Sequence, residues 1–128
     1  MRDDLIQALL PAAHEGTPNA FSAEFRLDPA LPVFRGHFPG RPLVPGVFEI
    51  EMVRLAVERH TGQRYRIASV TRAKFAGEVV PGDLVVLAAR VTPTDAGLSV
   101  SATLRVGDAT KGAVTMLLEP LTPGGHTR

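Results

Sequence analysis

The 128-residue sequence contains no cysteine and no tryptophan, and it has one tyrosine. Without cysteine the chain can form no disulfide framework, no thiolate nucleophile and no cysteine-based zinc site. This composition suits a reducing compartment, and Asp3 and Asp4 stand where a signal peptide would carry positive charge. We therefore expect a cytoplasmic protein that keeps its N-terminal segment.

Long apolar runs and a strong net charge are also missing. The longest uninterrupted apolar stretch, 84–89, is far shorter than the roughly 20 residues of a spanning helix, so we expect no membrane partner. The net charge is +1 and 5% of the residues are aromatic, which argues against a nucleic-acid partner. The hydrophobic fraction of 45% and the length fit a single domain over residues 1–128.

The spacing of apolar residues predicts the regular elements. A short helix is expected from Asp3 or Asp4 to Leu10, and a strand over 21–27. The segment 29–46 holds five prolines and three glycines, which excludes regular structure there. A helix over 47–60, closed by Gly62, is apolar on most sides and is therefore expected to be buried. Four strands are predicted after it, over 65–75, 84–94, 98–106 and 109–118.

This order of elements predicts an α+β fold. The turn signals between the four later strands, at residues 81–83, 95–97 and 107–108, indicate antiparallel strands joined by hairpins. The simplest way to bury one long helix is to wrap such a sheet around it. We therefore expect an antiparallel sheet wrapped around one central helix, with a frayed tail after Pro120.

One segment, residues 36–51, combines three groups that can act together. His37 stands in a rigid, proline-bounded loop, and an imidazole can serve as a base near neutral pH. Gly46 and Val47 begin the predicted helix, whose unpaired N–H groups and dipole can bind a developing oxyanion. Glu51 follows on a largely apolar flank, where desolvation favours the protonated form that a general acid needs.

Each of these residues also has an ordinary structural explanation. His37 could be a structural loop histidine, and Pro45 and Gly46 could simply start the helix. Glu51 could pair with Arg54, three residues further along the helix, and such an ion pair would oppose proton donation. Because exposed ion pairs are weak, we expect the desolvation of Glu51 to dominate. The spacing alone does not decide between the structural and the catalytic interpretations.

The run His-Phe-Pro-Gly-x-Pro-x-x-Pro-Gly-Val, with an acid fourteen residues after the histidine, is far more specific. It resembles the active-site signature of the hotdog-fold 3-hydroxyacyl-acyl-carrier-protein dehydratases. Every fixed position is filled here, by His37, Phe38, Pro39, Gly40, Pro42, Pro45, Gly46, Val47 and Glu51. The residues 74–75 and 80–83 are similar to the strand and turn that follow the helix in that family. The resemblance therefore covers roughly 33–119 and implies the hotdog fold.

The resemblance also implies the chemistry. His37 would take the α-proton of a 3-hydroxyacyl thioester, Glu51 would protonate the departing hydroxyl, and the amides of Gly46 and Val47 would hold the thioester oxygen. No metal and no redox cofactor would take part, and the four histidines of the chain are too scattered for a metal site. In this family the histidine and the acid of one site come from different subunits, which implies a homodimer or a trimer of dimers.

Two further groups of residues are candidates for substrate and carrier binding. Residues 35–74 hold eight basic and three acidic side chains, and a basic surface suits an acidic acyl carrier protein better than coenzyme A. The carrier-binding candidates are Arg35, Arg41, Arg64 and Arg66. The candidates for the lining of an acyl tunnel are Phe38, Phe48, Met52 and Leu55.

Two departures from the family pattern predict a specialised member, acting on a secondary-metabolite or polyene-type acyl chain. Leu55 stands where housekeeping members have a supporting glutamine, and the segment after Pro11 diverges from theirs. Two alternatives stay open. A hotdog thioesterase would release free thiol, although the intact loop at His37 argues against it. A non-catalytic acyl-carrier-binding subunit would keep the tunnel without efficient chemistry.

Overall fold

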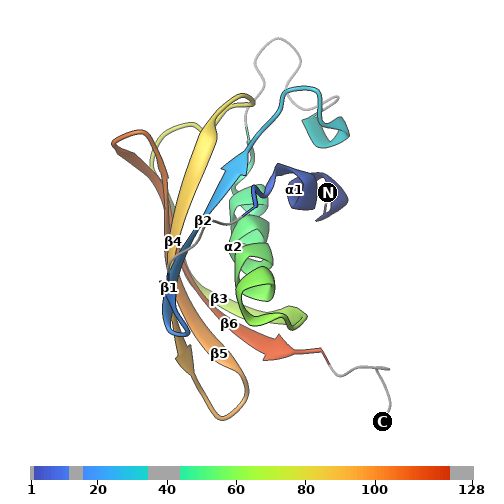
Figure 1. Cartoon of the computed structure of the whole chain (residues 1–128). Coiled ribbons are helices and arrows are strands. Elements are labelled where there is room, and N and C mark those ends of the chain that lie inside the picture. The colour runs from blue at the N-terminus through green and yellow to red at the C-terminus, as the bar shows by residue number, and fades with distance from the viewer. Residues whose placement is uncertain (1, 12–15, 35–43, 122–128) are drawn as a thin grey trace.

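The computed structural model describes residues 2–11, 16–34 and 44–121, and Figure 1 shows its elements along the chain. The elements lie close to the predicted ranges. The helices are α1 (Arg2–Ala8), η1 (a single 3₁₀ turn, Pro32–Phe34) and α2 (Gly46–Thr61). The strands are β1 (Gly16–Thr17), β2 (Ala20–Arg26), β3 (Tyr65–Phe75), β4 (Leu84–Pro93), β5 (Leu98–Val106) and β6 (Ala109–Pro120).

All six strands form one antiparallel sheet in the order β1-β2-β4-β5-β6-β3. Hairpins join β4 to β5 and β5 to β6, as predicted. The prediction of a hairpin between β3 and β4 is wrong, because β3 pairs with β6 at the other side of the sheet. The turn at 81–83 exists, but it packs against the end of β2, where the Gly82 N–H donates to the Leu27 carbonyl at 2.5 Å.

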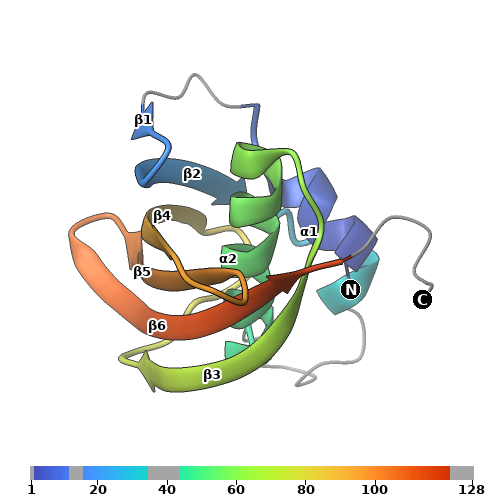
Figure 2. The ribbon, with the colours of Figure 1, turned by 90° about the horizontal axis from the view of Figure 1, so that it is seen from below.

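The sheet curves around α2, as Figure 2 shows from below, and α1 covers the side of α2 that faces away from the sheet (Figure 1). β2, β4, β5 and β6 alternate between buried and exposed residues, so that each gives one apolar face to the helix. The helix itself is buried on most sides, with Met52, Val53 and Val57 fully enclosed. The predicted α+β arrangement, a sheet wrapped around one long helix, is confirmed.

The two ends of α2 follow from its sequence. Pro45 precedes the first turn with an extended backbone, and the Phe48 N–H donates to its carbonyl at 2.9 Å. Gly62 ends the helix with φ +72°, a left-handed conformation that glycine adopts easily. The sequence did not reveal β1, whose two residues are too few to show a period. No helix in the described part of the chain is long and apolar enough to cross a membrane.

Candidate active site

The predicted oxyanion site lies where α2 begins. As the first residues of the helix, Gly46 and Val47 have amides with no partner in their own helix. The residues just before α2 are held in place by the segment after β3, because the Val44 N–H donates to the Val79 carbonyl at 2.7 Å. The side chain of Val47 is exposed, at 55%. The prediction that a helix begins here is confirmed, and the binding of an oxyanion by its first amides stays a prediction.

Gly46 is a glycine for a steric reason. A Cβ atom at this position would lie 2.7 Å from Cε2 of Phe75, which is closer than real Cβ contacts come. Phe75 is the last residue of β3 and is 42% exposed. The first residue of α2 is therefore packed directly against an aromatic ring at the end of an edge strand.

Glu51 is buried, as its place on the helix predicted, with 8% of its surface exposed, and two guanidinium groups lie against its carboxyl. Arg54, one turn further along, donates a hydrogen bond from its guanidinium to Oε2 of Glu51. A second guanidinium, that of Arg2 on α1, lies 4.0 Å from the same oxygen. The pairing with Arg54 is therefore present, and α1 packs on this face of α2 and brings a second cation. The expectation that desolvation of Glu51 outweighs this pairing stays a prediction.

Another buried carboxyl of α2, which the sequence analysis did not select, is that of Glu49. Its side chain is 2% exposed, and its Oε1 has no hydrogen-bond partner among the described residues. Burial raises the pKa of Glu49 from 4.5 to about 7. One signal could have identified it: an acidic residue in the first turn of a helix that is apolar on nearly every side has to be buried.

The described tunnel candidates are part of the core. Phe48 is 5% exposed, and its ring centroid lies 6.3 Å from that of Phe34 in the 3₁₀ turn η1. Met52 is completely buried, and Leu55 is 3% exposed. All three side chains therefore pack α2 into the core, and their role as the lining of an acyl tunnel stays a prediction.

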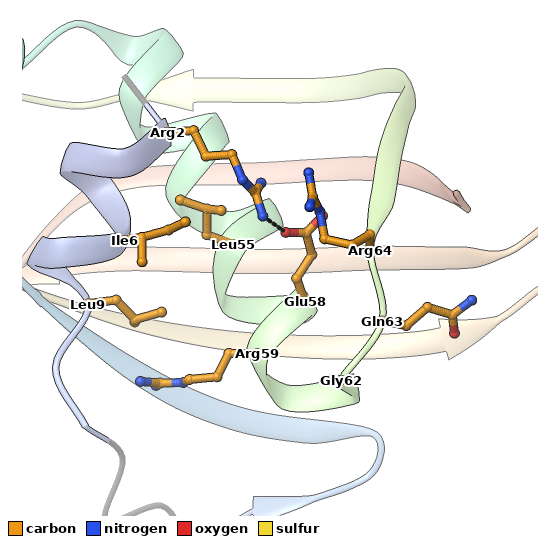
Figure 3. A pocket seen from close by; sticks show the side chains of 9 residues that line it. All are labelled: Arg2, Ile6, Leu9, Leu55, Glu58, Arg59, Gly62, Gln63 and Arg64. Carbon is orange, nitrogen blue, oxygen red and sulfur yellow. Dashed lines mark hydrogen bonds and ion pairs between the residues drawn. The ribbon is translucent and has the colours of Figure 1, made fainter. Parts of the chain in front are cut away.

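Leu55 also faces a pocket near the C-terminal end of α2. Figure 3 shows this pocket, of about 290 Å³, with apolar side chains from α1 on one side and charged side chains from α2 on the other. Glu58 accepts a hydrogen bond from Arg2 at 2.7 Å and one from the Tyr65 N–H at 2.8 Å, and Arg64 lies 3.7 Å from it. The carboxylate of Glu58 is thus fully used in joining α1, α2 and the start of β3.

Two of the four carrier-binding candidates are described. Arg64 and Arg66 are mostly exposed, and they pair with Glu58 and Glu119. Both follow the C-terminal end of α2, so within one chain they lie a helix length, roughly 24 Å, from Gly46. The remaining candidates, His37, Phe38, Arg35 and Arg41, lie outside the described residues.

No group of three or more histidine, cysteine, aspartate or glutamate side chains is placed to hold a metal ion within residues 2–11, 16–34 and 44–121. The chemistry available to the described part of the site consists of helix-end amides, one ion-paired carboxyl and one buried carboxyl.

Comparisons with curated proteins find the same family twice. The similar proteins carry the name 3-hydroxyacyl-acyl-carrier-protein dehydratase FabZ. The protein from Clostridium acetobutylicum is 37% identical over 62 residues, which are 43% of this chain and 44% of that protein. The protein from Klebsiella pneumoniae is 34% identical over 77 residues, 53% of this chain and 51% of that protein. The chain thus matches about half the length of these relatives.

Solved structures agree on the fold. The dehydratase heterocomplex ApeI:P from Xenorhabdus doucetiae has a TM-score of 0.74 at 24% identity, and the match covers 87% of this chain and 97% of that one. Thioesterase superfamily member 2 from Mus musculus has a TM-score of 0.69 at 10% identity, covering 94% and 86%. Both matches show the hotdog fold, in agreement with the sheet wrapped around α2.

A family model described as ApeI-like, ApeI dehydratase, matches residues 13–113. The match includes the whole signature, the three carboxyls of α2 and the Phe75 ring that contacts Gly46. On this evidence, the chain belongs to the ApeI-like family of hotdog-fold dehydratases.

Proposed function

We propose that this protein removes water from a 3-hydroxyacyl thioester on an acyl carrier protein and forms the trans-2-enoyl thioester. One observation carries the proposal: the complete signature ends on a helix whose first amides, at Gly46 and Val47, have no partner in their own helix. The curated relatives named FabZ and the ApeI-like match support the same reaction class.

In the proposed reaction His37 is the base. It takes a proton from C2 while negative charge develops on the thioester oxygen, which the amides at the start of α2 stabilise. The C3–O bond breaks, the C2–C3 double bond forms, and the hydroxyl leaves as water after a carboxyl group of α2 protonates it. The resemblance assigns this last role to Glu51. The protons then balance, since the base has gained one and the acid has lost one.

We further propose that the working protein contains two copies of the chain. β3 is an outer strand of the described sheet, and Val70 and Phe75 on it are 40% and 42% exposed. A long outer strand with exposed apolar side chains is suited to pair with another strand. The similar structure from Xenorhabdus doucetiae is a heterocomplex, so a related but different second chain is the alternative partner.

The substrate proposed here is a specialised acyl chain on a carrier protein, because the glutamine expected one turn after Glu51 is replaced by Leu55. The exposed guanidinium groups of Arg64 and Arg66 would attract an acidic carrier. Within one chain, Arg64 and Arg66 lie far from Gly46. The carrier would therefore contact them in an assembly in which the C-terminal end of one α2 lies near the N-terminal end of another.

The purified protein should be tested with 3-hydroxybutyryl and 3-hydroxydecanoyl thioesters, each on carrier protein and on coenzyme A. Enoyl product and free thiol should be measured in parallel. We expect enoyl product, with carrier-bound substrates preferred, and a loss of about 10² to 10⁴ in rate in His37→Ala. Free thiol without enoyl product would replace the proposal with a thioesterase. Carrier binding without either product would indicate a non-catalytic subunit.

A further inference from the structure

Arg54 is an unusual residue for a helix that is packed on most sides. Its side chain is 20% exposed, and its Nε atom is buried with no hydrogen-bond partner among the described residues. A buried N–H group without a partner costs stability, and an apolar side chain at this position would avoid that cost. The guanidinium of Arg54 therefore calls for an explanation in the work of the protein.

The two terminal nitrogens of this guanidinium join the acid of the signature to the backbone of β3. Nη1 donates to the carbonyl of Tyr65, the first residue of β3, at 3.2 Å. Nη2 donates to Oε2 of Glu51, which lies on the preceding turn of α2. Because a guanidinium is planar and its donors have fixed directions, two such bonds orient it better than a single ion pair. Arg54 therefore ties the carboxyl of Glu51 to a fixed point of the sheet.

The backbone that receives Arg54 is itself held by a second buried carboxyl. Tyr65 is 5% exposed, and its N–H donates to Oε2 of Glu58 at 2.8 Å. Arg2 donates to Oε1 of the same carboxyl at 2.7 Å, a contact that Figure 3 shows between α1 and α2. The Arg2 guanidinium also lies 4.0 Å from Oε2 of Glu51. The contacts thus form a closed ring of five residues from α1, α2 and β3.

On α2 itself, Arg54 is the neighbour of Glu51 that can support a carboxyl. Residues three and four positions apart on a helix lie beside one another. For Glu51 these neighbours are Val47, Phe48, Arg54 and Leu55. Of these four side chains, that of Arg54 alone carries a hydrogen-bond donor. Support for Glu51 from its own helix therefore depends on this residue.

The contacts of Glu51 with the described residues all reach the same carboxyl oxygen. The guanidinium groups of Arg54 and Arg2 both lie against Oε2, and no described residue donates a hydrogen bond to Oε1. In a protonated carboxyl, one oxygen carries the proton while the other can still accept a hydrogen bond. The bond from Arg54 therefore fits Glu51 both before and after it gives up a proton, and Oε1 is the oxygen left to carry that proton.

The position of Arg54 also suits the charge that forms in the proposed reaction. When Glu51 gives its proton to the C3 hydroxyl, a carboxylate forms on a residue that is 8% exposed. A cation that is fixed beforehand stabilises this charge without having to move when the charge appears. Arg2 contributes less, because its guanidinium lies 2.7 Å from Glu58 and 4.0 Å from Glu51. The cation that serves Glu51 is therefore Arg54.

We propose that Arg54 is a positioning residue for the proton donor Glu51. The proposal rests on the function proposed above and states how this chain holds its acid. Arg54 keeps Oε2 close to the backbone of Tyr65, so that the proton on Oε1 is directed to the leaving hydroxyl. As the C3–O bond breaks, this proton completes a water molecule, the base holds the proton from C2, and the carboxylate stays bound to Arg54. After the products leave, His37 releases a proton and Glu51 takes one up, which restores the starting state.

The test compares Arg54→Leu, Arg54→Lys and Arg54→Gln in the full-length chain, and thermal unfolding shows whether each variant folds. With the preferred thioester, Arg54→Leu should lower kcat by a factor of about 10 to 10², because a misplaced acid slows the reaction step. KM should change by less than about twofold, since Arg54 acts on the acid and not on substrate binding. Arg54→Lys and Arg54→Gln keep a hydrogen-bond donor and should recover part of kcat.

Arg105→Leu is the matched control. Arg105 on β5 is exposed, and its guanidinium also donates to a backbone carbonyl, that of Gly107, at 3.0 Å. This variant loses the same kind of bond at a position that has no contact with Glu51, so it should keep the wild-type kcat.

A double variant separates an action through Glu51 from a general effect on packing. In Glu51→Gln there is no acid to position, so adding Arg54→Leu should lower kcat little further. If the two losses multiply, Arg54 acts independently of Glu51 and the assignment is wrong. The assignment is also wrong if Arg54→Leu keeps the wild-type kcat while Glu51→Gln loses activity, and in both cases the proposed dehydration stands. If the wild type forms no enoyl product from any substrate, the proposed function fails and this assignment fails with it.

Discussion

The buried carboxyl group of Glu49 links this region to the stability of the whole chain. The pKa of Glu49 rises from 4.5 to about 7 in the folded protein, because burial disfavours the carboxylate. Between these values the folded chain keeps the proton and the unfolded chain releases it. The contribution of Glu49 to the free energy of unfolding is therefore fully present below about pH 4.5, and it is lost as the pH rises through about 7.

This linkage predicts a pH-dependent difference between the wild type and Glu49→Gln. The variant has no group to ionise at this position, so the wild type should lose stability relative to it between pH 5 and pH 8. The loss should approach about 3 kcal/mol at most, since each unit of pKa corresponds to about 1.4 kcal/mol. Urea unfolding at four pH values measures it. Glu24→Gln, at an exposed position of β2, is the control and should stay parallel to the wild type. Parallel curves for Glu49→Gln would contradict the shifted pKa.

At the scale of residues, the sequence was informative about motifs and less so about surroundings. The signature from His37 to Glu51 identified the family, and Gly46 does begin a helix. The state of each carboxyl could not be derived in the same way, because it depends on segments distant in the sequence. Arg2 reaches Glu51 from α1, and Gly112 makes room for Glu49 from β6. A helical wheel shows neither of these contacts.

Among the elements, α2 was predicted best, since its limits are set by local chemistry. Pro45 and Gly62 mark its ends, and its apolar positions required burial. The strands were also found from their alternation, but not the partner of each. β3 is next to β4 in the sequence, yet it pairs with β6. An alternating pattern shows which face of a strand is buried, but it does not show which other strand lies beside it.

The C-terminal end of α2 offers a test of whether the glycine that ends the helix stabilises the protein. Gly62 has φ +72°, and its N–H donates to the Glu58 carbonyl at 2.8 Å. A Cβ atom there would have no other atom within 4 Å, so an added side chain would not clash. Substitution therefore changes only how readily the residue adopts the left-handed conformation. Gly62→Ala should cost roughly 1 kcal/mol of unfolding free energy, measured by urea unfolding. Gly62→Asn should cost less, because asparagine tolerates this conformation. Equal stability of the alanine variant and the wild type would show that the cap adds nothing.

At the scale of the whole molecule, the sheet has an open side. β3 pairs with β6 on one side only, and most of its residues are exposed in the described chain. Monomeric proteins usually protect such a strand with charges, prolines or a covering segment. Here Val70 and Phe75 on β3, together with Leu117 on the neighbouring β6, are partly exposed apolar side chains. A second sheet that continues this one across two β3 strands would cover them.

This arrangement predicts a dimer whose stability depends on β3. Light scattering after gel filtration should give about twice the mass of the 13.7 kDa chain. Val70→Asp would place like charges at the junction of the two strands, so the variant should dissociate at concentrations where the wild type remains dimeric. Ile6→Asp is the matched control, because Ile6 is 44% exposed and belongs to α1, which packs on α2 and β2. If both variants stay dimeric, the two chains associate through another surface. If dissociation also removes dehydratase activity while the monomer remains folded, each active site depends on both copies.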